Sequence, residues 1–208
     1  MLGQVHHACP SLRLPVARLL IAEAESELQP NVLSSLAAAL GHNGHPERLS
    51  ALVNLADHPD ANVRHAVAAS LGGVEEPAAV ATLLKLSDDP DADVRDWATF
   101  GLGSMTELDT PQLRQALLAR TEDSDEETRG EAIVGLARRR DVRVVAVIER
   151  ELCRPDVATL VVEAVREFPQ PSFLAGMKQL DRETWDLEAV ADAIAACGGD
   201  PEAAPRNR

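Results

Sequence analysis

The chain has 208 residues and a formal net charge of −14, because 34 Asp and Glu outnumber 20 Lys and Arg. A surface of this charge repels a phosphate backbone, so the composition disfavours nucleic acid and favours a basic protein or peptide as partner. Hydrophobic residues make up 45% of the chain but aromatic residues only 2%. The core must therefore be built from Ala, Leu and Val, and a large aromatic-lined cofactor pocket is not expected.

The start of the chain, MLGQVHH, lacks the cationic and apolar regions of a signal peptide, and no apolar run approaches membrane-spanning length. The three cysteines, Cys9, Cys153 and Cys197, are odd in number and lack metal-site spacing, as expected in a reducing compartment. These features predict a soluble cytoplasmic protein without a cofactor. We expect loosely ordered ends at residues 1–14 and 198–208 around a single body at residues 15–197.

A repeat of 31 residues organises that body. Residues 60–72 (DANVRHAVAASLG) recur as residues 91–103 (DADVRDWATFGLG). We place a proline at the start of a helix in each repeat, and a glycine just after a helix in a left-handed conformation. Each repeat therefore contains two helices joined by a turn. The residues that share the interval are Pro15, Pro46 and Pro77; Val32, Val63 and Val94; and Gly41, Gly72 and Gly103.

The second repeat shows the pattern most clearly. Residues 49–56 carry apolar side chains at helical spacing, and residues 57–60 (DHPD) end this helix and cap the next. A three-residue insertion near residues 105–107 interrupts the period. The inner stripes of the second helices are Val63, Val67, Ser70 and Leu71; Val94, Ala98, Gly101 and Leu102; and Thr128, Ala132, Gly135 and Leu136. A fifth pair is expected at residues 142–152 and 158–165, and a sixth at residues 173–180 and 187–197.

Residues 91–98 (DADVRDWA) and 127–136 (ETRGEAIVGL) resemble the second helix of HEAT repeats of the phycobilisome-lyase-like type. The resemblance covers residues 15–197 and is strongest over residues 46–140. Residues 91–152 are also similar to small bacterial HEAT-repeat proteins associated with Rhs-type loci. The expected fold is an all-α solenoid, a right-handed α-α superhelix of about six antiparallel helix pairs.

In HEAT repeats, an Asp before the second helix and an Arg within it form a structural ladder between units. The first repeat has Leu33, and the fifth Val161, where the Arg would stand, so the ladder should fail at both ends. An Asp at a helix start and an Arg one turn inside it also satisfy backbone donors and pair charges, which argues against acid–base chemistry. The ladder residues are Asp60, Arg64, Asp91, Arg95, Asp125 and Arg129.

A second face of the same helices is the candidate binding surface. A position that holds a charged residue in one repeat should not be fully buried at the matching position of the next repeat. In a HEAT solenoid, the candidate binding face would line the concave side. Aromatic side chains there would supply contact area, and carboxylates would select a basic partner. Alternatively, Trp97 and Phe100 fill gaps between helices. The predicted surface comprises Asn62, His65, Asp93, Asp96, Trp97, Phe100, Glu127 and Glu131.

Other candidate sites have structural explanations. His42 and His45 flank Gly44 in a turn without a third ligand, so no metal site is predicted. Deoxyhypusine hydroxylase, a HEAT-repeat metalloenzyme, binds iron through His-Glu pairs, and this chain contains no His-Glu dipeptide. A basic cluster at Arg138, Arg139, Arg140 and Arg143 lies where a helix ends and complements its dipole. No catalytic or phosphate-binding motif is present.

The sequence thus predicts a non-catalytic scaffold or adaptor that binds a basic protein or peptide on an acidic concave surface. Rhs loci encode toxins, so an immunity-type or regulatory role is one version of this prediction. Two alternatives remain open. A bilin lyase-like or other enzyme-associated chaperone would carry chromophore or metal, and a nucleic-acid-binding HEAT-like protein would need a basic concave face.

Overall fold

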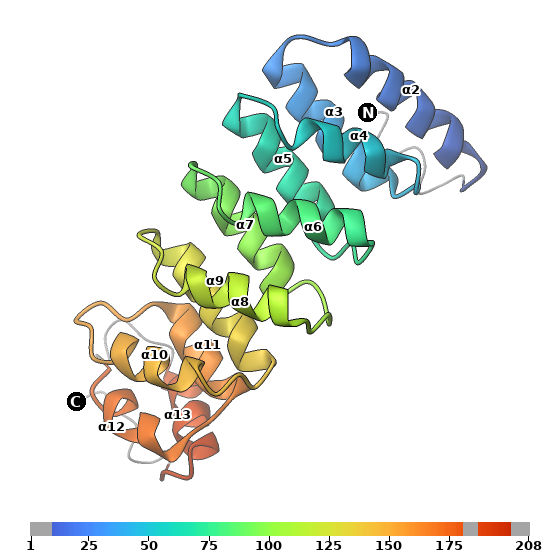
Figure 1. Cartoon of the computed structure of the whole chain (residues 1–208). Helices are drawn as coiled ribbons and strands as arrows, with labels where there is room; N and C mark the ends of the chain where they lie inside the picture. Colours follow the sequence, from blue (N-terminus) through green and yellow to red (C-terminus); the bar gives the residue numbers. More distant parts are fainter. Residues whose placement is uncertain (1–9, 181–186, 201–208) are drawn as a thin grey trace. The chain divides into compact units, whose positions relative to one another are not determined.

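The computed structural model describes residues 10–180 and 187–200, and the secondary structure of these residues is entirely helical (Figure 1). The chain divides into two compact units, Met1–Leu108 and Asp109–Arg208, and the single body at residues 15–197 stays a prediction. The boundary directly follows the insertion at residues 105–107 that breaks the 31-residue period. The predicted loose ends lie partly outside the described residues, at 1–9 and 201–208.

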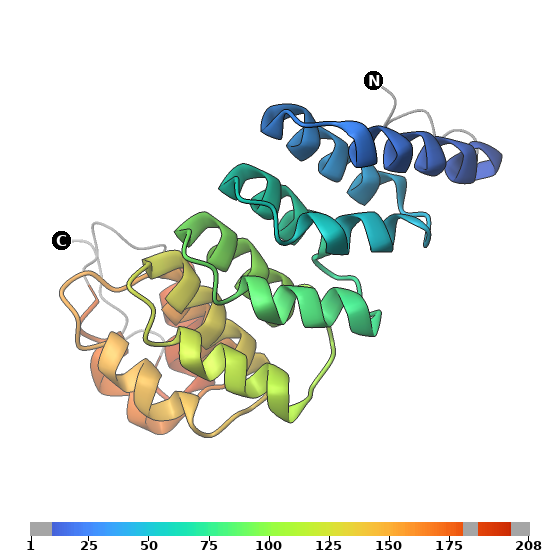
Figure 2. The ribbon, with the colours of Figure 1, turned by 45° about the horizontal axis from the view of Figure 1, so that its top comes forward.

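The first unit contains three helix pairs. Figure 2 shows α2, α4 and α6 in one layer and α3, α5 and α7 in the other, and α5 packs against both α3 and α7. Helical structure begins at Pro10, within the segment for which the sequence predicts loose order. The elements are η1 Pro10–Leu12, α2 Arg13–Ser26, α3 Pro30–Asn43, α4 Arg48–Leu55, α5 Ala61–Leu71, α6 Pro77–Leu86 and α7 Ala92–Gly103.

The second unit continues the pairing. Helix α11 packs against α9 and α13. The helix expected at residues 173–180 is instead a 3-10 turn followed by a single α-helical turn, whereas α13 begins where the sequence predicts it. The elements are α8 Pro111–Arg120, α9 Glu126–Arg138, α10 Val144–Glu151, α11 Thr159–Glu167, η2 Pro171–Phe173, α12 Leu174–Met177 and α13 Leu187–Ala196.

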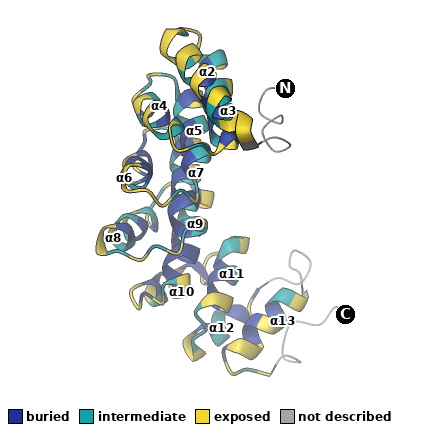
Figure 3. Cartoon of the chain, turned by 90° about the vertical axis from the view of Figure 1, so that its right-hand side faces the viewer, coloured by how far each residue is buried: buried dark blue, intermediate teal, exposed yellow. Residues whose placement is uncertain are grey.

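Small aliphatic side chains build the core, as the composition predicts. Val63, Val67 and Leu71 on α5 are each 0% exposed, and burying a side chain of this size stabilises the fold by about 1.5–3 kcal/mol. Figure 3 shows α5 and α7 as largely buried or half-buried, whereas α2 carries exposed residues along its length. Val63 and Val94 of the 31-residue period thus mark the helix face that packs inward, whereas Val32 is half-buried.

The periodic glycines have a different role from the predicted one. Gly41 lies inside α3, and Gly72 has a φ of −53° rather than a left-handed value. A Cβ added at Gly41 would lie 2.5 Å from Oγ of Ser70, and one added at Gly101 would lie 3.3 Å from Cα of Gly72. These small residues therefore let neighbouring second helices approach closely. The left-handed conformation falls instead on Gly44, which ends α3 with a φ of 71°, and on Gly73, which directly follows Gly72 and has a φ of 74°.

The prolines also deviate from a single rule. Pro77 is the first residue of α6, as predicted. Pro46 lies two residues before α4, and Pro15 is the third residue of α2. All three positions fall where a backbone N–H has no intrahelical acceptor, which is why proline is tolerated at each of them.

Candidate functional site

An aspartate caps the second helix of three successive repeats. The side chain of Asp60 accepts a hydrogen bond from the backbone N of Asn62 at 2.9 Å. Asp91 and Asp125 cap α7 and α9 in the same way, through the backbone N atoms of Val94 at 3.3 Å and Thr128 at 2.9 Å. A carboxylate at this position satisfies an unpaired amide and complements the helix dipole.

The arginine four residues after each capping aspartate reaches back to the preceding turn. Arg64 Nη1 donates to the carbonyl oxygens of His58 and Pro59, both at 2.9 Å. Arg95 and Arg129 contact the equivalent carbonyls of their own turns at 2.9–3.2 Å and 2.9–3.0 Å. Each arginine thereby fixes the turn that leads into its own helix.

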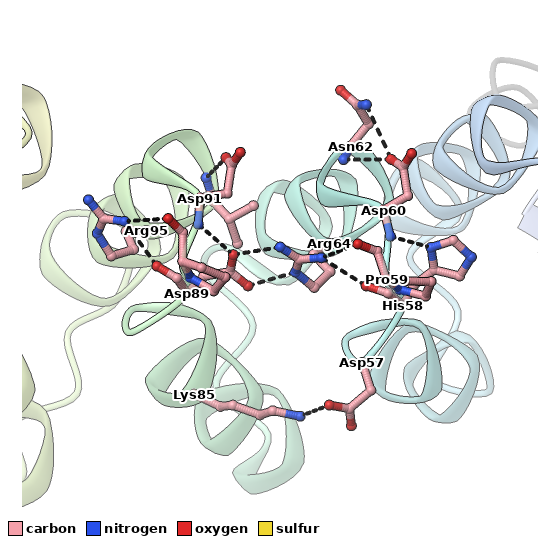
Figure 4. Close-up of polar contacts among 12 residues, drawn as sticks. Asp57, His58, Pro59, Asp60, Asn62, Arg64, Lys85, Asp89, Asp91 and Arg95 are labelled. Carbon is pink, nitrogen blue, oxygen red and sulfur yellow. Dashed lines mark hydrogen bonds and ion pairs between the residues drawn. The ribbon is translucent and has the colours of Figure 1, made fainter.

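In the first unit the arginine also reaches forward to the next repeat. Arg64 makes a bidentate pair with Asp89, with both N–O distances at 2.7 Å. Figure 4 shows the Arg64 guanidinium between Asp89 and the turn at His58 and Pro59. The partner is thus Asp89, two residues before the capping Asp91, which donates its backbone N–H to Asp89 at 3.0 Å. The capping and pairing carboxylates are different residues.

Both side chains of this pair are nearly buried, with 12% of Arg64 and 6% of Asp89 exposed. Burial alone would raise the pKa of Asp89, but the hydrogen bonds from Arg64 and from the Asp91 backbone outweigh it and hold the pKa below its usual value. In the second unit Arg129 lies 4.0 Å from Glu151, which is 5% exposed. Leu33 and Val161, which replace the arginine in the first and fifth repeats, are buried.

The candidate binding residues of the first unit lie on α5 and α7. Trp97 is 38% exposed and is flanked by two rings. The ring centroid of His65 lies 5.6 Å from that of Trp97 at 81°, and that of Phe100 lies 5.9 Å away at 85°. Both contacts are edge-to-face, a favourable arrangement that holds the indole in place. Asn62 and Asp93 are exposed and His65, Asp96 and Phe100 half-buried, and we call these six residues the aromatic–acidic face.

The second unit does not repeat this surface. Glu127 is exposed and Glu131 half-buried on α9. Gly130 and Val134, however, match His65 and Ala69 and are buried, with Val134 1% exposed. A Cβ at Gly130 would lie 2.5 Å from Cδ1 of Leu160, because the side chain of Leu160 covers this part of α9. The comparison of repeats therefore overestimated exposure here, and Glu127 and Glu131 have no aromatic neighbour at the matched positions.

The structure also contains a pocket that sequence reasoning missed. It has a volume of about 430 Å³ and lies between α3 and α5, with Arg48 from the start of α4 at its edge. His65 lines it, so the pocket adjoins the aromatic–acidic face. The signal in the sequence is the small side chains Ala38 and Gly41 on α3 and Ala66 and Ala69 on α5, which leave space between the two helices.

The remaining candidates make structural contacts. His42 Nδ1 lies 2.7 Å from the carbonyl oxygen of Ala38, and His45 Nδ1 accepts from the backbone N of Glu47. Within the described ranges, no three His, Cys, Asp or Glu side chains are placed so that they could hold a metal ion. None of the described helices is long and apolar enough to cross a bilayer.

The basic cluster at the end of α9 is divided among separate partners. Arg138 pairs with Glu163 at 2.9 Å, and Arg139 Nη1 donates to the carbonyl oxygen of Gly135. Arg143 pairs with Asp141 at 2.6 Å, and these hydrogen bonds hold the pKa of Asp141 well below its usual range although burial opposes the shift. Arg140 is exposed, with a φ of 49°.

Paired helices with capping aspartates and turn-binding arginines define a helical-repeat protein. The family model described as HEAT repeats matches residues 17–103 and 85–168, and the chain belongs to this family. The E. coli protein YibA is 26% identical, with a TM-score of 0.76 over 95% of this chain and 72% of that chain.

Two further solved structures share the fold. The CpcE–CpcF complex of phycocyanin lyase from Nostoc sp. PCC7120 is 18% identical, with a TM-score of 0.53 over 89% of this chain and 77% of that chain. An engineered protein is also 18% identical, with a TM-score of 0.54 over 98% of this chain and 96% of that chain. No curated protein sequence matches the chain. The association with Rhs-type loci stays a prediction.

Proposed function

We propose that the chain is a non-catalytic interaction module and that the aromatic–acidic face of the first unit docks a basic segment of a protein partner. The observation that carries this proposal is Trp97, a large aromatic side chain that is 38% exposed yet held between two other rings. Tryptophan is among the residues that contribute most to binding when a partner buries it, and its loss from an interface centre costs about 2 kcal/mol or more.

The exposure of Trp97 argues against a purely structural role. A side chain that only filled the space between helices would be buried, as Phe173 is at 0% exposed. The two edge-to-face contacts leave part of the indole open to solvent while restricting its motion, so a partner would lose little additional side-chain entropy on binding.

The carboxylates around Trp97 favour a cationic partner. Asp93 is exposed and Asp96 half-buried on the same helix as the indole. A Lys or Arg placed over the indole would gain about 0.5–2 kcal/mol from the cation–π interaction. The aspartates would mainly raise the association rate at low ionic strength, since exposed charges are screened beyond about 10 Å at 0.1 M salt.

The alternatives have less support. The likeness to the phycocyanin lyase complex, at 18% identity, extends to the fold, and an excess of 14 negative charges opposes binding to a phosphate backbone. Immunity-type and regulatory roles both fall within the proposed docking function and differ in the partner rather than in the site.

Quantitative capture of partners from cell extract tests the proposal. The wild type would be compared with the Trp97→Ser/Phe100→Ser variant and with Leu19→Ser, which removes a 64% exposed side chain elsewhere in the same unit. We expect basic proteins to be retained by wild type and by Leu19→Ser, to be lost with the double variant, and to elute at raised salt. Unchanged capture by a double variant of unchanged helicity would refute the proposed site.

A further inference from the structure

The pocket between α3 and α5 has a floor of unusually small side chains. Ala38 and Gly41 line it from α3, and Ala66 and Ala69 line it from α5. Its volume of about 430 Å³ falls within the range of about 300–1,000 Å³ that is typical of ligand pockets. A floor of this kind accommodates one apolar side chain from a binding partner.

Arg48 gives one side of the pocket a positive charge. Its side chain is half-buried, and its Nη1 donates to the carbonyl oxygen of His45 at 3.3 Å. Its Nε is buried without a hydrogen-bond acceptor, and among the described residues no carboxylate pairs with it. Arg18 and Arg64, in contrast, make bidentate pairs with Glu47 and Asp89.

An incompletely paired, half-buried guanidinium is costly, because burial removes water and nothing replaces it fully. A carboxylate is the acceptor that best matches a guanidinium, through two parallel N–H···O bonds. His42 and His65, whose rings can donate hydrogen bonds, line the same pocket, and its lining contains no Asp or Glu. In a chain with 34 acidic residues, a pocket lining without carboxylates favours a ligand group that carries a negative charge inside the pocket.

The aromatic–acidic face next to the pocket has the opposite preference. Asp93 and Asp96 lie near the start of α7, whereas the pocket is lined by the C-terminal half of α5, and His65 belongs to both. A ligand that satisfies both surfaces is apolar and anionic at one end and cationic along the rest. The C-terminus of a basic polypeptide has this arrangement without needing an acidic side chain.

We propose that the pocket binds the C-terminal residue of the docked segment, with its apolar side chain on the small-residue floor and its main-chain carboxylate against Arg48. This proposal rests on the proposed function, because it identifies which part of the basic partner reaches the first unit. The aromatic–acidic face then contacts the cationic residues that precede the C-terminus. Capture of a terminal carboxylate is a recurring mode of peptide recognition.

The test uses small probes and the full chain, so it needs no known partner. N-acetyl-L-leucine mimics an apolar C-terminal residue, and N-acetyl-L-leucinamide lacks only the carboxylate. Titration followed by ¹H–¹⁵N NMR should give saturable shifts at the amides of Gly41, Ala69 and Gly72 with the acid. The amide should bind at least about tenfold more weakly, as expected for loss of a charge-assisted hydrogen bond.

Variants assign the effect to the pocket. Arg48→Gln should remove the difference between acid and amide, whereas Arg13→Gln, which removes a charge from an exposed arginine of the same unit, should preserve it. Ala69→Leu should block both probes by filling the floor. Equal binding of acid and amide to the wild type would overturn the proposal even if Arg48→Gln failed to fold.

Two outcomes separate this proposal from its alternatives. Tighter binding of N-acetyl-L-aspartic acid α-amide than of N-acetyl-L-leucine would indicate an internal acidic side chain instead of a C-terminus and would overturn the proposal. Trp97→Ser should leave the leucine titration unchanged while it abolishes partner capture. Failure of the docking proposal and failure of the pocket proposal are therefore distinguishable.

Discussion

The Arg64–Asp89 pair should contribute far more to stability than any exposed ion pair of the first unit. The Arg64→Met substitution keeps much of the aliphatic stem but leaves the Asp89 carboxylate, 6% exposed, without its guanidinium partner and with the backbone N–H of Asp91 as a hydrogen-bond donor. It also removes the hydrogen bonds to the carbonyl oxygens of His58 and Pro59. Breaking a buried pair by removing one partner costs about 3–5 kcal/mol.

A matched control lies in the same two repeats. Lys85 pairs with Asp57, as Figure 4 shows, but these side chains are 53% and 77% exposed. Solvent screens such a pair, so Lys85→Met should cost about 0–1 kcal/mol. Both substitutions remove one positive charge and introduce the same side chain, and the difference between them therefore reports the burial of the Arg64 pair together with its hydrogen bonds to the turn at His58 and Pro59.

Urea unfolding followed by circular dichroism at 222 nm would measure the free energy of unfolding, and hydrogen exchange would locate the loss. Protection should fall in α5 and α6, because repeat proteins are stabilised mainly by contacts between neighbours. Adding Asp89→Asn to Arg64→Met should restore part of the stability, since it removes the uncompensated charge. If Arg64→Met cost no more than Lys85→Met, the pair would not stabilise the repeat junction.

Three further outcomes follow from the described contacts. Gly41→Ala should destabilise the first unit by about 1–3 kcal/mol because of overpacking against Ser70, and Ser70→Gly should restore part of the melting temperature. The depressed pKa of Asp89 stabilises the fold above the unfolded-state pKa of about 3.9, so stability should fall as the pH drops toward the folded pKa, and less so in Asp89→Asn. In a Cys9→Ser background, a disulfide reagent should react rapidly with exposed Cys153 and slowly with Cys197, whose thiol pKa is raised by burial.

The periodic sequence was sufficient to predict the helix pairs and the inward face. Val63 and Val94 occupy matching, fully buried positions because a 31-residue interval that preserves apolar spacing must return the chain to the same face of each successive helix. Asp60 and Asp91 were equally predictable as caps, since the cap depends on neighbouring residues alone.

Features that depend on contacts between repeats were harder to predict. The carboxylate that pairs with Arg64 is Asp89. The residue that matches Asp89 one repeat earlier is His58, so a carboxylate does not recur at this position in every repeat. The burial of Val134 depends on how α11 covers α9, and the glycine at position 41 reflects a close approach to Ser70 rather than a helix end. The exposure of Trp97 could be proposed from its charged counterpart Glu131. That His65 and Phe100 lie on either side of the indole could be seen only in the structure.

The backward reach of each arginine has a consequence for chain length. Excising residues 60–90, one period of 31 residues, would join Pro59 directly to Asp91. Arg95 would then meet the carbonyls of His58 and Pro59 in the same chemical positions that Arg64 contacts now. The new junction therefore keeps both the capping aspartate and the hydrogen bonds of the arginine to the turn. A shortened variant of 177 residues, roughly one module smaller, should still pack α7 against the turn at His58 and Pro59.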